Sequence, residues 1–162
     1  MTFLPRRHDT IDTFQSPPTV LDVLLPYIKK GWIVWERACG RGNLVKRLFQ
    51  EGYTTIATDI TTGLDFPTQE PGFPYEIVLT NLPYFLKNEF LQRCYDLGKP
   101  FALLLPVNAL DTPKRQGLYK DYGLDVLLLP SQVSFRNLDG KHARFVCGWF
   151  TRGILPKPLI FT

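Results

Sequence analysis

The sequence has few of the residues that bind metals or form disulfides. It contains two histidines and three cysteines, and the cysteines (Cys39, Cys94 and Cys147) lie far apart in the chain. A structural zinc site needs four ligands, mostly His and Cys at close spacing, so the sequence argues against a bound metal. An odd number of cysteines without a disulfide framework is typical of a reducing compartment, and we expect a cytoplasmic protein.

Long apolar runs are also missing. No stretch reaches the roughly 18 residues of a membrane-spanning helix, and residues 1–9 contain no apolar core of signal-peptide length. Acidic residues are slightly outnumbered, with 19 Lys and Arg against 15 Asp and Glu and a net charge of +4. We therefore expect a soluble protein with no membrane partner and a mild preference for anionic partners.

The 162 residues have the length of one domain, and we expect a single domain over residues 1–162 with a flexible lead-in at 1–13. Apolar runs predict strands at 32–35, 54–58, 76–80, 101–105 and 124–129. Helically spaced apolar residues predict helices at 20–28, 44–51, 90–97 and 112–122. This alternation is typical of an α/β fold with a mostly parallel, twisted sheet and helices on both faces. The segments 132–136 and 143–151 flank Asp139-Gly140 and predict a closing antiparallel hairpin.

A turn rich in glycine follows the first expected strand. Glu36 ends the strand, and Gly40 and Gly42 in the turn let the backbone approach a ligand closely. Asp59 ends the second strand, 17 residues after Gly42, where a carboxylate can bind both ribose hydroxyls of a nucleoside. A dinucleotide site would need a third glycine where Val45 stands. The pattern predicts a nucleoside cofactor without a phosphate, although glycines in such a turn are often simple turn formers.

This turn, and the turn after the third expected strand, resemble motifs of a known enzyme class. The segment 36–42, Glu-Arg-Ala-Cys-Gly-Arg-Gly, resembles the first motif of amino-methylating S-adenosylmethionine enzymes, with Arg37 in place of the usual proline. Asn81-Leu82-Pro83-Tyr84 resembles the catalytic motif of adenine-N6 methyltransferases, and its form is similar to that of ribosomal RNA adenine dimethylases. The resemblance implies a Rossmann-like, class I S-adenosylmethionine-dependent methyltransferase.

Two further segments resemble motifs of the same enzymes. Ser16-Pro17-Pro18 resembles the Thr-Pro-Pro segment that contacts the methionine end of the cofactor, and Asp65-Phe66 resembles a pair near the cofactor's adenine. The stretch between the second and third strands is shorter than in full-size enzymes, so we expect a shallow adenine pocket. The cofactor-binding residues that the resemblance implies are Ser16, Pro17, Glu36, Ala38, Gly40, Gly42, Asp59, Ile60, Asp65, Phe66 and Asn81.

The resemblance also assigns chemical roles to the segment 81–84. The exocyclic amine of adenine is a weak nucleophile because its lone pair is delocalised into the ring. The side-chain oxygen of Asn81 and the carbonyl of Leu82 can accept hydrogen bonds from its two N–H groups. These hydrogen bonds stabilise the positive charge that develops on the amine during methyl transfer. Tyr84 would stack on the base, and Pro83 completes the catalytic set. Taken alone, the segment is also a common turn after a strand.

Basic residues near the expected hairpin are candidates for phosphate contacts. They are Lys87, Arg136, Lys141 and Arg144, with His142, Lys114 and Arg115 nearby. Scattered surface charge explains each of them singly just as well. We expect DNA or RNA as the substrate; protein glutamine-N5 methylation and a non-catalytic cofactor-binding subunit or regulator stay open as alternatives. No segment resembles a target-recognition domain, which is compatible with a homodimer or a partner subunit that supplies recognition.

Overall fold

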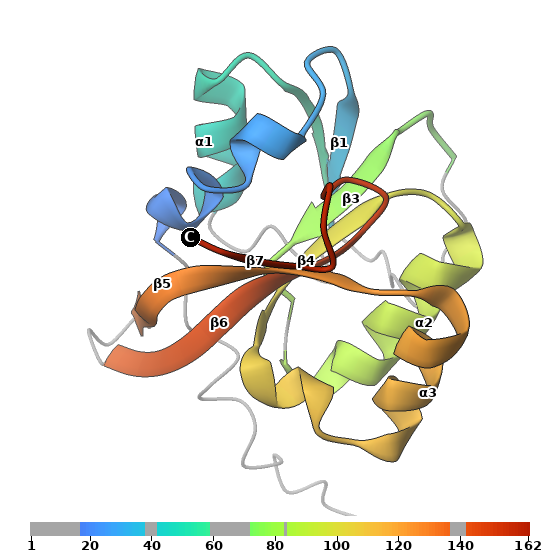
Figure 1. Ribbon diagram of the computed structural model, residues 1–162. Helices are drawn as coiled ribbons and strands as arrows, with labels where there is room; N and C mark the ends of the chain where they lie inside the picture. Colours follow the sequence, from blue (N-terminus) through green and yellow to red (C-terminus); the bar gives the residue numbers. More distant parts are fainter. Residues whose placement is uncertain (1–16, 38–41, 59–71, 83, 137–141) are drawn as a thin grey trace, which may run out of the picture.

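The computed structural model describes residues 17–37, 42–58, 72–82, 84–136 and 142–162, which form an α/β fold on one twisted sheet (Figure 1). The seven strands of these residues lie in the order β2-β1-β3-β4-β6-β5-β7. Neighbouring strands are parallel except around β6, which runs antiparallel to both β4 and β5. The expected mostly parallel sheet with a closing antiparallel hairpin is therefore confirmed. The strands are β1 (Ile33–Glu36), β2 (Thr54–Ala57), β3 (Ile77–Thr80), β4 (Phe101–Pro106), β5 (Asp125–Arg136), β6 (His142–Arg152) and β7 (Leu159–Phe161).

Helices cover both faces of the sheet (Figure 1). Side chains alternate between the two faces along each strand, so Val34 packs into one core and Trp35 into the other. The core of Val34 lies under α1 (Asn43–Gln50) and the 3-10 helices η1 (Pro18–Leu21) and η2 (Leu25–Tyr27). The core of Trp35 lies under α2 (Lys87–Leu97) and α3 (Pro113–Tyr122). Two short 3-10 helices, η4 (Tyr84–Leu86) and η5 (Val107–Leu110), follow β3 and β4.

The continuous helix expected over residues 20–28 is wrong, because the structure has the two short helices η1 and η2 there. Pro26 has no N–H to donate, and its ring would clash with the carbonyl four residues earlier in an α-helix. The inward face is nevertheless the expected one. Val20, Leu21, Leu24 and Ile28 are all buried, with at most 5% of their surface exposed.

Helix α1 confirms the expected inward face only in part. The helical spacing of Leu44, Val45, Leu48 and Phe49 predicts that all four face inward. Leu44 and Leu48 are buried, but Phe49 is 77% exposed. Residues four apart lie on the same side of a helix, and each next residue is turned by about 100°. Leu48 takes the inner position after Leu44, so Phe49 is turned to solvent.

Strand β5 joins two segments that the sequence predicts as separate. Leu128 pairs with Gly148 and Gln132 pairs with Val146, so the register shifts between them and three residues of β5 lie opposite one of β6. Pro130 lies within this bulge, where its missing N–H breaks no regular ladder bond. The bulge therefore lets one long strand accommodate a proline.

The β5–β6 hairpin extends beyond the parallel part of the sheet (Figure 1). Pro106, the last residue of β4, pairs with Cys147. The first residues of β6, from His142 to Val146, therefore lie past the carboxyl end of β4. This outer part of β6 lies at the edge of the sheet where the site residues are expected.

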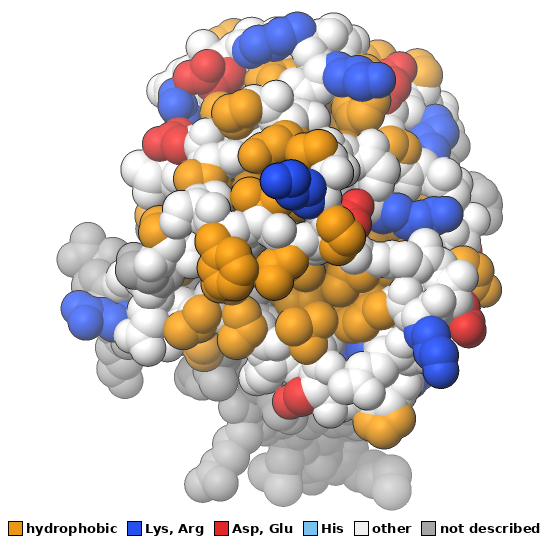
Figure 2. Space-filling model, viewed as in Figure 1, with side chains coloured by type: hydrophobic (Ala, Val, Ile, Leu, Met, Phe, Trp, Pro, Cys, Tyr) orange, Lys and Arg blue, Asp and Glu red, His pale blue; other side chains and the backbone are white. Residues whose placement is uncertain are grey.

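Strand β7 is the outermost strand of the described sheet, at the side opposite to β2. Figure 2 shows hydrophobic side chains gathered on the face on which this strand lies. Leu159 and Phe161 of β7 are 51% and 72% exposed. Exposed apolar surface of this kind is common on folded proteins in small amounts.

Candidate active site

The carboxyl ends of β1, β2 and β3 lie side by side at one edge of the sheet. Glu36, the last residue of β1, pairs with Ala57, the last residue of β2. Trp35 pairs with Val78, and β3 continues from there to Thr80. The segment that begins with Asn81 therefore leaves the sheet beside the end of β1. Ligands of open α/β sheets bind at this edge.

The ends of β1 and β2 are held together by buried hydrogen bonds. The amide of Thr58 donates to the carbonyl of Glu36 at 2.9 Å, and the Trp35 indole Nε1 donates to the Thr58 hydroxyl at 2.8 Å. Glu36 and Arg37 are 1% and 2% exposed, and both interact with other groups. A carboxylate and a guanidinium are costly to bury unless each has polar partners, which makes this strand end a polar site inside the fold.

The glycine turn after β1 reaches α1 through Gly42. This residue has φ 78° and ψ 22°, a left-handed conformation that strains other residues. A Cβ placed on Gly42 would meet no atom of the described residues within 4 Å. The carbonyl of Gly42 accepts a hydrogen bond from the amide of Lys46 at 2.9 Å, which is the first hydrogen bond of α1. Gly42 therefore ends the turn in a conformation that suits glycine and leads directly into α1.

The turn after β3 presents a hydrogen-bond acceptor. The side-chain oxygen Oδ1 of Asn81 is buried and accepts no hydrogen bond from the described residues. A buried acceptor without a partner costs free energy, and native structures keep few of them. Leu82 is 3% exposed and packs in the core under α2 and α3, which fixes the backbone directly after Asn81.

Tyr84 is held by the hairpin strand β6. Its ring contacts the ring of Phe145 in an edge-on arrangement. Burial raises the pKa of the Cys147 thiol to about 12, and the nearby Tyr84 hydroxyl acts in the opposite direction. Cys147 therefore stays a neutral thiol at physiological pH and is no nucleophile. Both of these neighbours of Tyr84 therefore come from β6.

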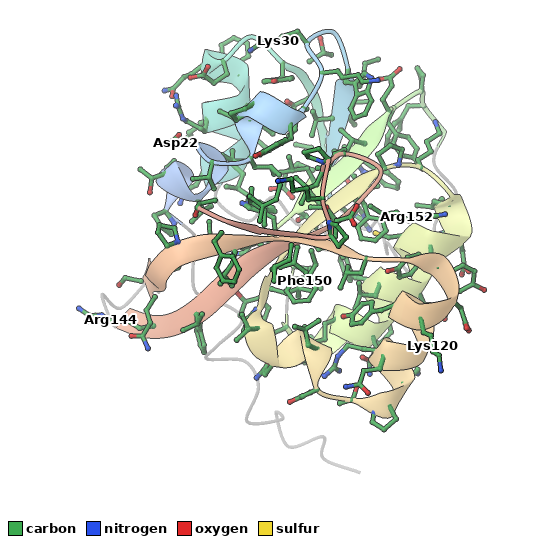
Figure 3. All side chains as sticks on the ribbon, viewed as in Figure 1. Asp22, Lys30, Lys120, Arg144, Phe150 and Arg152 are labelled. Atoms are coloured by element: carbon green, nitrogen blue, oxygen red, sulfur yellow. The ribbon has the colours of Figure 1, made fainter. Side chains whose placement is uncertain are left out.

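The structure places some of the basic residues that are expected at a phosphate surface. Lys87 is the half-buried first residue of α2, and Arg144 is exposed on the outer part of β6. Figure 3 shows Arg144 pointing outward from the hairpin, far from Lys120 on α3. Arg136 pairs with His142 in the register of the same hairpin.

The expectation that Arg115 lies on the phosphate surface is wrong. Its side chain is buried, and its guanidinium donates to the carbonyl of Ala109 at 2.7 Å, to Asn88 Oδ1 at 2.9 Å and to Asp111 Oδ1 at 2.7 Å. These bonds tie α3 to η5 and α2. The sequence shows a basic residue here, but only the fold shows that its donors are already used.

Several expected site residues lie outside the described residues, and their roles stay predictions. They are Ser16, Ala38, Gly40, Asp59, Ile60, Asp65, Phe66, Pro83 and Lys141. Sequence reasoning missed the part played by Trp35, Phe145 and Cys147 around the site. The signal that could have indicated Trp35 is its indole N–H, which needs an acceptor when the side chain is buried.

Within the described part of the chain, no three His, Cys, Asp or Glu side chains come together in a way that could hold a metal ion. No described helix has both the length and the apolar character needed to cross a membrane.

No protein-family model and no curated protein matches this sequence significantly. Solved structures do match. A modification subunit assigned to a type I restriction enzyme from Vibrio vulnificus shares 14% identity at a TM-score of 0.57, over 93% of this chain and 46% of that chain. The methyltransferase subunit of a type I restriction-modification system from Streptococcus thermophilus shares 16% identity at a TM-score of 0.53, over 92% of this chain and 47% of that chain.

A TehB-like S-adenosylmethionine-dependent methyltransferase from Corynebacterium glutamicum shares 13% identity at a TM-score of 0.53, over 85% of this chain and 88% of that chain. The chain thus spans about half the length of the two restriction-modification subunits and most of the third protein. At these identities the likeness establishes the fold, which is the Rossmann-like fold of class I S-adenosylmethionine-dependent methyltransferases.

Proposed function

We propose that the protein transfers a methyl group from S-adenosylmethionine to the exocyclic N6 amine of adenine in DNA or RNA. The observation that carries the proposal is the buried Asn81 Oδ1, which accepts no hydrogen bond from the described residues and follows β3 at the ligand-binding edge of a methyltransferase fold. An adenine amine is a donor that satisfies this acceptor.

The described residues at the ends of β1 and α1 fit the cofactor. Among the described residues, a Cβ on the left-handed Gly42 would meet no atom within 4 Å, and Glu36 is buried at the end of β1. A carboxylate there can accept hydrogen bonds from an ammonium group. Ser16, Pro17, Ala38, Gly40, Asp59, Ile60, Asp65 and Phe66 complete the proposed cofactor set. When bound, the cofactor supplies an electrophilic methyl group on its sulfonium.

The segment 81–84 binds and orients the amine. Asn81 Oδ1 and the carbonyl of Leu82 accept hydrogen bonds from its two N–H groups. These bonds draw the nitrogen lone pair away from conjugation with the ring and stabilise the positive charge on the nitrogen during transfer. Tyr84 stacks on the base and, with Pro83, limits its orientation, which is a positioning effect. No strong general base is needed, because the methylated amine loses its proton readily to water.

The substrate proposal rests on charge. The net charge of +4 favours an anionic partner, and Arg144 is exposed on the outer part of β6, the same strand that holds Tyr84. Lys87, Arg136 and Lys141 are the other candidates for phosphate contacts. Two of the structural neighbours are subunits of restriction-modification systems, which agrees with a nucleic-acid substrate.

The test is to express the protein in a bacterial host and to quantify N6-methyladenine in digested DNA and RNA by mass spectrometry. Asn81→Ala removes the acceptor, and Asn108→Ala is the matched control, because Asn108 is an exposed asparagine of η5. We expect excess N6-methyladenine with the unmodified protein and with Asn108→Ala, and loss of the excess with Asn81→Ala.

Two other outcomes would overturn the proposal. Methylated glutamine in host proteins, without a nucleoside product, would indicate amide methylation. Binding of S-adenosylmethionine in calorimetry, with no methylated product of any kind, would indicate a non-catalytic subunit.

A further inference from the structure

We infer that Trp149 is a positioning residue that places the segment next to the methionine end of the cofactor. The inference rests on the proposed function, because it assumes that Ser16 and Pro17 contact that end. The inference assigns a role to a side chain of β6 that the sequence predicts only to be part of the core.

Trp149 forms a buried hydrogen bond that joins strand β6 to helix η1. Its indole Nε1 donates to the carbonyl of Val20 at 2.8 Å, and the Trp149 side chain is fully buried. The amide of Val20 in turn donates to the carbonyl of Pro17 at 3.2 Å. Two consecutive hydrogen bonds therefore connect β6 with Pro17, the residue that follows Ser16.

This link matters because η1 has little local support of its own. It is a 3-10 helix of four residues, and no side chain caps its first turn at Pro17. Short 3-10 helices have poor hydrogen-bond geometry and are weakly stable by themselves. The position of Pro17 is therefore set by packing and by the Trp149 bond.

Separate contacts hold the part of the η1–η2 segment that follows η1. Arg47 of α1 forms an ion pair with Asp22 at 2.9 Å, and the hydroxyl of Tyr53 donates to the carbonyl of Ile28 at 2.9 Å. Figure 3 shows Asp22 beside α1. These contacts stabilise η1 and η2 without reaching Pro17, so the segment has one anchor near the proposed site and others away from it.

Trp149 belongs to a row on β6 that also reaches the catalytic turn. Phe145, Cys147 and Trp149 alternate along the strand and pack into the same core. Phe145 and Cys147 contact Tyr84, and Trp149 contacts Val20. One face of β6 thus contacts both η1, which directly follows Pro17, and Tyr84, which is proposed to stack on the base.

The test compares two variants that each remove one buried hydrogen bond to the η1–η2 segment. Trp149→Phe removes the bond to Val20, and Tyr53→Phe removes the bond to Ile28. Calorimetry measures binding of S-adenosylhomocysteine, which has the amino-acid end, and of 5′-methylthioadenosine, which lacks it. Trp149→Phe should weaken S-adenosylhomocysteine about tenfold, the equivalent of about 1.4 kcal/mol, and change 5′-methylthioadenosine by less than about twofold. Tyr53→Phe should leave both ligands within about twofold.

Equal weakening of both ligands by Trp149→Phe, or no weakening at all, would overturn the inference while leaving the proposed function standing. Failure of the unmodified protein to bind either ligand would overturn the proposed function and the inference with it. If Trp149→Phe does not fold, benzothienylalanine at position 149 keeps the bicyclic shape without the N–H, and the same pair of ligand affinities decides the result.

Discussion

The ring of Tyr84 meets the ring of Phe145 edge-on, with centroids 5.9 Å apart and ring planes at 86°. Phe145 lies on the outer part of β6, past the residue that pairs with the end of β4. Aromatic pairs in this geometry restrain each other beyond simple burial. The proposed catalytic turn is therefore oriented by the β5–β6 hairpin, which comes much later in the chain.

Replacing Phe145 by Leu should lower kcat for methyl transfer by roughly tenfold, since small displacements of a positioning group reduce rates strongly. The affinity for S-adenosylhomocysteine should stay unchanged, because Phe145 acts through its ring contact with Tyr84, in the turn proposed to bind the base. Steady-state kinetics and calorimetry measure the two effects. Phe161→Leu is the matched control, because Phe161 is 72% exposed on β7. Equal kcat values for the two variants would contradict this account of Tyr84.

Arg115→Met should destabilise the fold without weakening nucleic-acid binding. The change removes the Arg115 donor to Asn88 Oδ1 and one of the two donors to the Ala109 carbonyl, which keeps its bond from the Tyr119 hydroxyl. We expect it to lower the free energy of unfolding by about 3 kcal/mol. The corresponding fall in Tm is roughly 6–12 °C, measurable by circular dichroism. Lys120→Met, an exposed position of the same helix, should stay within about 0.5 kcal/mol. A selective loss of affinity for nucleic acid in folded Arg115→Met would show that Arg115 binds phosphate after all.

Gly148→Ala should destabilise the sheet. An added Cβ would lie 3.0 Å from Val126 Cγ1 and 3.1 Å from the Leu127 carbonyl oxygen, and overpacking of this kind costs about 1–3 kcal/mol. Gly117→Ala is the matched change in helix α3, where an added Cβ meets no atom within 4 Å. It should stabilise the fold by about 0.5–1 kcal/mol, because glycine is a poor helix former. Urea unfolding compares the two, and effects of the same sign would contradict the packing around Gly148.

The free energy of unfolding should fall as pH rises above about 9. Burial raises the pKa of Cys147 from 9.0 to about 12 and that of Tyr119 from 10.0 to about 12. Between these values the unfolded chain loses protons that the folded protein keeps, so unfolding becomes more favourable as pH increases. The stability that these groups contribute is complete below pH 9 and is lost towards pH 12. Urea titrations from pH 8 upward measure it.

Cys147→Ala should make that alkaline decline less steep, because one of the titrating groups is removed. An unchanged slope would mean that the Cys147 thiol is accessible and ionises equally in both states. Native alkylation by iodoacetamide gives a second reading, since the folded protein should protect Cys147 at pH 8.

Much of the fold follows from local pattern. The alternation of apolar runs and helical spacing predicts the order of strands and helices, because both signals come from residues a few positions apart. The first helical segment is the exception, since Pro26 changes its type while its buried residues stay the same. The motif residues Glu36, Gly42 and Asn81 are likewise visible in the sequence, because each stands at the end of a predicted strand or turn.

The sequence alone therefore determined most of the residues that enter the sheet, though not those of β7, and which residues follow its carboxyl ends. Only the tertiary structure decided what those residues touch. Arg115 uses its donors inside the fold, Tyr84 packs against β6, and Trp149 anchors the carbonyl of Val20, 129 residues earlier in the chain. The contacts of Tyr84 and Trp149 join segments that are distant in sequence, and their partners are chosen by sheet order and register, which no local spacing encodes.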